Sequence, residues 1–128
     1  MRIIKVLAMF IIAALLVRAD DTESATREAT RRAFLRSWER SLIPLVASQS
    51  LDAASSYGYR ELNPLLAGRN GDFGARATNV KFAVVFALVG VEYLLARKSP
   101  KAARLFEKLN WTSSALTTGL AVRNYVVR

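Results

Sequence analysis

The chain has 128 residues, with 19 Lys and Arg against 10 Asp and Glu, a formal net charge of +9, and apolar side chains at 52% of positions. That length accommodates a single domain. Because the chain contains no His and no Cys, disulfides, Cys or His zinc sites, Ser-His-Asp triads and cysteine nucleophiles are excluded.

Residues 1–19 have the pattern of a secretory signal peptide. Arg2 and Lys5 are followed by an apolar run over residues 6–17, and small or β-branched side chains stand one and three residues before the bond after Ala19. As a helix this run is about 18 Å long, which is shorter than the roughly 30 Å hydrocarbon core of a bilayer. We therefore expect export and cleavage after Ala19, with an uncleaved anchor as the alternative.

Residues 20–40 form a charged segment that is predicted to be an amphipathic helix. Apolar side chains recur in steps of three and four from Ala25 to Leu42. Trp38 has arginines on both sides, which is typical of a helix at a membrane interface. A solvated helix that packs its apolar stripe on the rest of the protein is the alternative.

Three apolar helices are predicted after this segment, over about residues 41–57, 80–96 and 100–127. Only the middle one has a long uncharged core, from Phe82 to Val91. The other two each carry one polar stripe at helical spacing, which we expect to face a bundle interior rather than lipid. The stripes are Ser48, Asp52, Ser55 and Tyr59 in the first helix, and Asn110, Ser113 or Ser114, Thr117, Ala121 and Asn124 in the last.

The expected fold is all-α, a small bundle of three, or four, membrane-spanning helices preceded by the amphipathic helix. Ser99 followed by Pro100 is a favourable N-cap and first residue for the last helix. The glycines of residues 68–74 lack the preceding strand and following helix of a phosphate-binding loop, so this segment is predicted to be a turn.

Two polar clusters are the candidate sites. An up-down-up bundle brings Asp52, Lys81 and Arg123 to a similar depth, with Glu61 and Asn63 just outside. A charge inside a bilayer costs roughly 2.5 to 3.5 kcal/mol on insertion scales, so such a group usually has a partner. The pairs either fix helix register or handle protons or ions through Asp52. A Mg or Ca site formed by Asp52, Glu61 and Asn63 is a weaker alternative.

The second candidate cluster lies at the other end of the bundle. There Glu92 is predicted to meet Lys98 or Lys108, or else Asn110. We expect no catalytic residue, no metal and no cofactor in either cluster.

The chain resembles an uncharacterised family of small bacterial membrane proteins with a leader and three short helices. The resemblance spans about residues 49–127, and its most specific element is Asp52 followed by Glu61-Leu-Asn63-Pro64-Leu65. Looser matches are Gln49 to Ser56, Lys81, Pro100 to Ala103, Asn110 and Asn124-Tyr125. The family pattern has a His where this chain has Arg123, which weakens any metal-binding proposal. The resemblance implies no activity.

The sequence thus predicts a small integral protein of the bacterial inner membrane, non-enzymatic and either structural or partner-binding. Its partners would be the lipid bilayer and another membrane protein or a second copy, but no nucleic acid, because the Lys and Arg residues are dispersed in an apolar chain. An ion- or proton-handling protein, a membrane enzyme and an exported soluble helical bundle are the alternatives. The two orientation signals conflict. Cleavage after Ala19 would place residues 97–108, which carry five basic side chains, outside the cell, whereas the positive-inside rule favours a cytoplasmic location for these residues.

Overall fold

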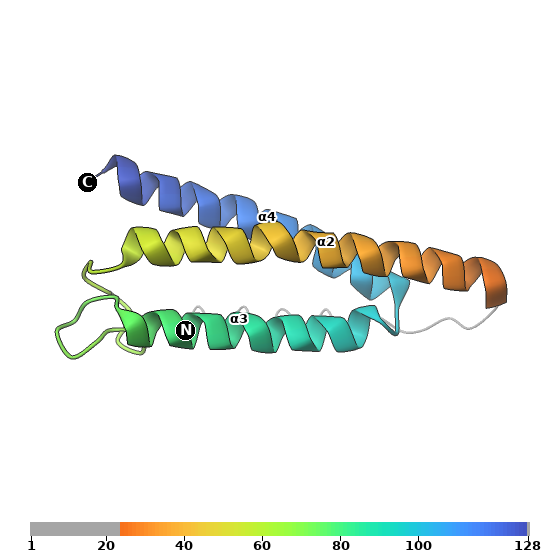
Figure 1. The fold of residues 1–128 in the computed structure, drawn as a ribbon, viewed down its shortest axis with the longest axis horizontal. Helices are drawn as coiled ribbons and strands as arrows, with labels where there is room; N and C mark the ends of the chain where they lie inside the picture. The colour runs from red at the N-terminus through yellow and green to blue at the C-terminus, as the bar shows by residue number, and fades with distance from the viewer. Residues whose placement is uncertain (1–23, 128) are drawn as a thin grey trace.

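The computed structural model describes residues 24–127, which form three α-helices (Figure 1). They are α2 (Ser24–Ser56), α3 (Ala75–Ala96) and α4 (Pro100–Val126). The predicted all-α class is confirmed for this part of the chain, where an isolated Arg60–Asp72 bridge is the only β pairing. The predicted signal peptide, residues 1–19, lies outside the described residues.

Helix α2 differs from the predicted arrangement because it is one continuous helix of 33 residues. The amphipathic segment 20–40 and the first apolar helix were expected to be separate, but no glycine or loop sequence stands between them. Pro44 lies inside α2. A proline inside a helix loses the hydrogen bond to the carbonyl four residues earlier, and its ring crowds that carbonyl, at a cost of about 3 kcal/mol. The packing of α2 on α4 offsets this cost.

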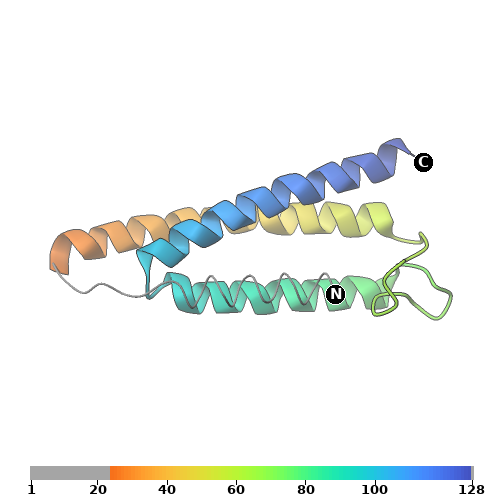
Figure 2. The same ribbon diagram turned by 180° about the vertical axis from the view of Figure 1, so that it is seen from behind.

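Helices α2 and α4 lie side by side and run in the same direction, with α3 returning antiparallel to them (Figures 1 and 2). Helix α3 begins at Ala75, five residues before the predicted start, because Gly74 supplies an extended N-cap there. Helix α4 begins as predicted: the Ser99 side chain accepts a hydrogen bond from the Ala102 N–H at 3.3 Å, and Pro100 is the first helical residue.

Helix α3 is attached to the other two helices near its ends. Near its C-terminus, Ala96 packs in an apolar cluster with Trp38 and Phe106. Near its N-terminus, Ala77 packs with Ala53 of α2 and with Phe73. The middle of α3 therefore has an apolar surface that the bundle covers little.

The connection between α2 and α3 doubles back on itself. The Phe73 N–H donates to the Tyr59 carbonyl at 2.7 Å, and the Gly58 N–H donates to the Phe73 carbonyl at 2.8 Å. Gly71 has a φ of 78°, in the left-handed region that favours glycine. The segment is thus an ordered turn with its own backbone hydrogen bonds, which holds Phe73 in the small apolar cluster.

Among the helices of residues 24–127, only α3 is long and apolar enough to cross a membrane, and only 11% of its most apolar window is buried. The sequence predicted three such spans. Length and composition support α3 as a span. They do not support α2 and α4, because the polar stripes of these two helices lower their mean hydropathy.

Candidate functional site

A row of polar side chains fills the contact between α2 and α4, and we call it the polar seam. Ser37 Oγ donates to Glu107 Oε1 at 2.6 Å, Asn110 Nδ2 donates to Ser41 Oγ at 3.1 Å, Gln49 Nε2 donates to Thr117 Oγ1 at 3.3 Å and Asn124 Nδ2 donates to Ser55 Oγ at 3.2 Å. The partners are separated by 70, 69, 68 and 69 residues. This nearly constant offset shows that the two helices pack in parallel and in one register.

The sequence spacing of the inward side chains explains this parallel packing. On α2 and on α4 these positions follow one another in steps of three and four, which is the spacing of helices that pack along their length. They are Phe34, Trp38, Ser41, Leu45, Ser48, Asp52 and Ser55 on α2, and Ala103, Phe106, Asn110, Ser114, Thr117, Ala121 and Asn124 on α4, all buried or half-buried. Small hydroxyl side chains at many of them let the two helices approach closely.

The first candidate site within the bundle centres on Glu92, whose side chain is 2% exposed. Its Oε2 accepts hydrogen bonds from Trp38 Nε1 and from Asn110 Nδ2, both at 2.9 Å. Ser41 joins the group because its hydroxyl accepts from Asn110 and donates to the Trp38 carbonyl. One carboxyl group thus links all three helices through neutral donors.

The Glu92 site differs from the predicted second cluster in its partners. Asn110 is present, whereas Lys98 and Lys108 are exposed on the outside of the bundle. Trp38, for which the sequence allowed either a lipid interface or packing against the rest of the protein, is 2% exposed and points inward. The Trp indole N–H requires a partner when it is buried, and Glu92 provides that partner.

The second candidate site is the ion pair between Lys81 of α3 and Asp52 of α2. The two side chains are 16% and 21% exposed, so the pair is largely removed from solvent. Of the predicted first cluster, these two residues meet. Arg123 is exposed on α4 and is not part of the pair.

Glu61 and Asn63 are engaged in the α2–α3 connection. Glu61 Oε1 accepts from the Asn63 N–H at 2.7 Å, and Asn63 Oδ1 accepts from the Leu65 N–H at 3.1 Å. These bonds stabilise a turn and leave the two residues apart from Asp52. Within residues 24–127, no group of three acidic side chains could hold a metal ion.

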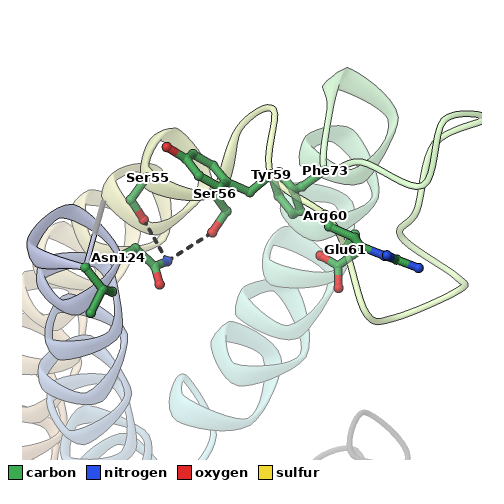
Figure 3. Close-up of a pocket in the computed structure, with 8 residues that line it drawn as sticks. Ser55, Ser56, Tyr59, Arg60, Glu61, Phe73 and Asn124 are labelled. Atoms are coloured by element: carbon green, nitrogen blue, oxygen red, sulfur yellow. Dashed lines mark hydrogen bonds between the residues drawn. The ribbon is translucent and has the colours of Figure 1, made fainter.

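A pocket of about 270 Å³ opens where α2, α4 and the α2–α3 connection meet. Figure 3 shows the Asn124 amide directed toward the hydroxyls of Ser55 and Ser56, with Arg60 and Glu61 on the opposite side. Its lining is evenly polar and apolar, without a convergent set of charged groups. The pocket marks the end of the polar seam, and its chemistry does not single out a ligand.

Beyond the bundle, Glu28 on the first turns of α2 is bonded to two arginines. Arg31 and Arg32 donate to its carboxylate at 2.7 to 2.8 Å. The hydrogen bonds from Arg31, and then those from Arg32, lower the pKa of Glu28 from 4.5 to about 2. Arg31 Nη1 also donates to the Arg97 carbonyl at 2.7 Å, which joins this part of α2 to the α3–α4 turn.

Four polar-seam residues belong neither to a predicted cluster nor to a predicted stripe: Ser37, Ser41, Gln49 and Glu107. Trp38, which bonds to Glu92, was not predicted as a site residue either. Periodicity could have found Ser41, which lies seven residues before Ser48 on the same stripe. Trp38 gives no such signal, because its apolar neighbours and flanking arginines suit an interface equally well.

Comparison of the chain with protein-family models, with curated proteins and with solved structures finds no match. The family resemblance described above therefore stays a prediction, and the assignment of function rests on the geometry of the bundle.

Proposed function

We propose that the chain is a small integral membrane protein whose helices insert as a bundle with a polar interior and an apolar exterior. The observation that carries this proposal is the distribution of side chains. The buried polar residues are Ser41, Ser48, Ser55, Glu92, Asn110 and Ser114, whereas large apolar residues are exposed on all three helices, including Ile43 (73%), Phe86 (59%) and Leu116 (66%).

A water-soluble bundle places most of its large apolar side chains inside, whereas among residues 24–127 the large apolar side chains that are buried are Trp38, Leu45, Phe73 and Phe106. The other buried apolar residues are alanines. A soluble protein rarely exposes apolar patches larger than a few hundred Å². In a bilayer the arrangement is favourable, because polar side chains on facing helices hydrogen-bond to one another and the outer faces contact lipid. At 1.5 Å per residue, α3 is about 33 Å long, which matches the hydrocarbon thickness.

The polar seam accounts for the less apolar composition of α2 and α4. Their hydroxyl and amide groups lower the mean hydropathy of each helix, but these groups face the partner helix rather than lipid. Such helices insert more readily as a packed group than alone, since each supplies hydrogen-bond partners for the other.

Within the membrane, the proposed role is structural or partner-binding rather than enzymatic. The ionisable groups of the interior are engaged with one another or with neutral donors: Asp52 with Lys81, and Glu92 with Trp38 and Asn110. These contacts link the helices and specify one register, which is the best-attested use of buried polar groups. The exposed face of α3 is then available to lipid or to another membrane protein.

The test compares two exposed apolar residues by alkaline carbonate extraction of membranes that contain a C-terminally tagged chain. The wild-type chain is expected in the pellet. Phe86→Lys puts a charge on the lipid face of α3, at a cost of about 3 kcal/mol, and is expected to lose the membrane-inserted fraction. Leu62→Lys is the matched control, since Leu62 is 89% exposed in the α2–α3 connection and should stay in the pellet.

Release of the wild-type chain into the supernatant would refute the proposal and favour an exported helical bundle. Unchanged retention of Phe86→Lys would show that α3 does not face lipid.

Proton handling is a second candidate function, and one observation favours it. Polar side chains lie between the Glu92 site and the Asp52–Lys81 pair: Ser48 is buried there, and Gln49 donates to Thr117. Proton-transporting proteins place ionisable side chains inside the membrane, between packed helices. Vesicles that contain the purified chain and an internal pH dye would acidify under an imposed potential, and Glu92→Gln should abolish the flux. Equal rates with and without protein would exclude this function.

A further inference from the structure

Basic side chains from two distant parts of the sequence gather at one end of the bundle, which we call the basic end. The hydrogen bond from Arg31 to the Arg97 carbonyl, and the position of the Arg104 guanidinium 3.7 Å from the centre of the Phe34 ring, bring them together. The basic end comprises Arg27, Arg31, Arg32, Arg36 and Arg40 of α2 and Arg97, Lys98, Lys101, Arg104 and Lys108 of the α3–α4 turn and α4. These are ten of the 19 Lys and Arg residues in the chain.

The opposite end of the bundle carries fewer cations in excess: within residues 24–127 it has five Lys and Arg residues against three Asp and Glu residues. Lys81 is paired with Asp52, and the connection between α2 and α3 carries Glu61 and Asp72 as well as arginines. Among residues 24–127, the acidic residues near the basic end are Glu28, Glu39, Glu92 and Glu107, and Glu92 is buried. Within residues 24–127, the excess of cations over anions is therefore larger at the basic end, with ten against four, than at the opposite end.

The cations at the basic end point outward on more than one side. Arg36 and Arg40 stand two residues before and after the buried Trp38, so each lies about 200° around α2 from the packed face. Both are exposed. Lys101 and Lys108 are likewise exposed on α4, where Phe106 is buried between them. A folded partner or a nucleic acid would contact one side of such a bundle, whereas a planar layer of head groups surrounds it.

The basic end also lies where an apolar span ends. Helix α3 stops at Ala96, and Arg97 and Lys98 follow directly. Helix α2 extends past this level by residues 24–30, about 10 Å of helix, as Figures 1 and 2 show. In a bilayer that α3 crosses, this places Arg97, Lys98 and Lys101 at the depth of the lipid phosphates. Arg40 and Lys108 lie about one turn deeper, near the level of Glu92, and their long side chains reach toward the head groups.

We propose that the basic end binds the anionic head groups of phospholipids and that this contact sets the orientation of the protein. The start of α2 and the α3–α4 turn lie on the leaflet rich in anionic lipid, the cytoplasmic one, and the α2–α3 connection lies on the other side. This inference rests on the proposed membrane location. The orientation is opposite to the one that cleavage after Ala19 would give.

The two tryptophans of the chain allow a direct test of lipid binding. Trp38 bonds to Glu92, and Trp111 follows Asn110 at the same level, so both lie in the half of the bundle near the basic end. The full chain is reconstituted into vesicles of phosphatidylcholine and phosphatidylglycerol, in which one lipid carries bromine near the head-group end of its acyl chains. Tryptophan quenching then measures the association of each lipid. At low salt, phosphatidylglycerol is expected to bind about fivefold more strongly, the gain from one Lys or Arg near an anionic surface.

The matched variants remove three cations from either end. Arg36→Gln, Lys101→Gln and Lys108→Gln together should abolish the preference for phosphatidylglycerol, and Arg69→Gln, Arg76→Gln and Arg123→Gln together should keep it. All six side chains are exposed. Equal quenching by the two lipids in the wild-type chain would overturn the inference and leave the membrane location intact. Absence of quenching by either lipid would overturn both. Displacement of phosphatidylglycerol by a duplex oligonucleotide would assign the basic end to nucleic acid instead.

Orientation is measured separately with single cysteines, since the chain has none of its own. In intact cells, Asn70→Cys in the α2–α3 connection should react with a membrane-impermeant maleimide. Thr26→Cys near the start of α2 should react only after lysis. The reverse pattern would overturn the proposed orientation.

Discussion

The ion pair between Asp52 and Lys81 gives a prediction whose size follows from the structure. Lys81→Met and Asp52→Asn each leave one ionic group without its partner. Exposed pairs contribute about 0 to 1 kcal/mol, and removing one partner of a fully buried pair costs about 3 to 5 kcal/mol. Because these side chains are 16% and 21% exposed, we expect each single change to cost about 2 kcal/mol, roughly a 30-fold change in the folded-to-unfolded ratio.

The double variant separates the pair from its surroundings. Asp52→Asn with Lys81→Met leaves no uncompensated charge, so it should cost about 2 kcal/mol in total rather than about 4, a coupling of about 2 kcal/mol. The measurement is an SDS titration of the chain in mild detergent, followed by helical circular dichroism. Lys101→Met is the control, since an exposed cation on α4 should change the free energy of unfolding by less than about 0.5 kcal/mol.

Additive costs in the double variant would refute the reasoning. They would mean that Asp52 and Lys81 contribute independently and that the pair does not attach α3 to α2.

Three further predictions concern packing, the α2–α3 connection and charge. Phe106→Ala, at a side chain 1% exposed, should cost about 3 kcal/mol in the same titration, and a loss below 1 kcal/mol would contradict the described core. Gly71→Ala should cost about 1 kcal/mol because the residue has a φ of 78°, and Gly71→Asn should cost less. The Glu28 carboxyl should titrate by NMR with a pKa of about 2. Since this pKa is lowered on folding, its ion pairs stabilise the start of α2 above about pH 4.5 and are lost as the pH falls toward 2. Replacing both Arg31 and Arg32 with Gln should restore the pKa toward 4.5.

The sequence supported the fold where a local chemical signal was strong. Ser99 and Pro100 mark the start of α4 by capping chemistry alone, and the polar stripes of α2 and α4 identified the sides of the helices that meet. The length of α2 was not predictable in this way. The charged and apolar halves differ in composition, and the sequence near Pro44 gives no sign that packing against α4 keeps the helix continuous.

The sequence predicted the side of the helix on which each site residue lies better than it predicted the residue's partners. Helical spacing specifies which side of a helix a residue occupies, but not which helix it meets or at what height. The inward position of Trp38 depends on Glu92, which is 54 residues away. Arg123 has the same depth as the Asp52–Lys81 pair in a simple bundle, but its place on the outer face of α4 keeps it exposed. The periodicity of the sequence predicts neither the inward position of Trp38 nor the exposure of Arg123.

The constant offset between α2 and α4 has a consequence for the order of assembly. During synthesis, Ser41 and Ser55 of α2 leave the ribosome about 70 residues before Asn110 and Asn124, the α4 side chains that bond to them. Contacts with so large a sequence separation form late. Before α4 arrives, Asp52 can already pair with the Lys81 side chain on α3. The chain therefore passes through a two-helix stage in which the hydroxyls of α2 bond to their own backbone, as those of Ser41, Ser48 and Ser55 still do in the finished bundle. These bonds within α2 give its serine hydroxyls hydrogen-bond partners before α4 is made. Packing of α4 then adds further hydrogen bonds and leaves the existing ones in place.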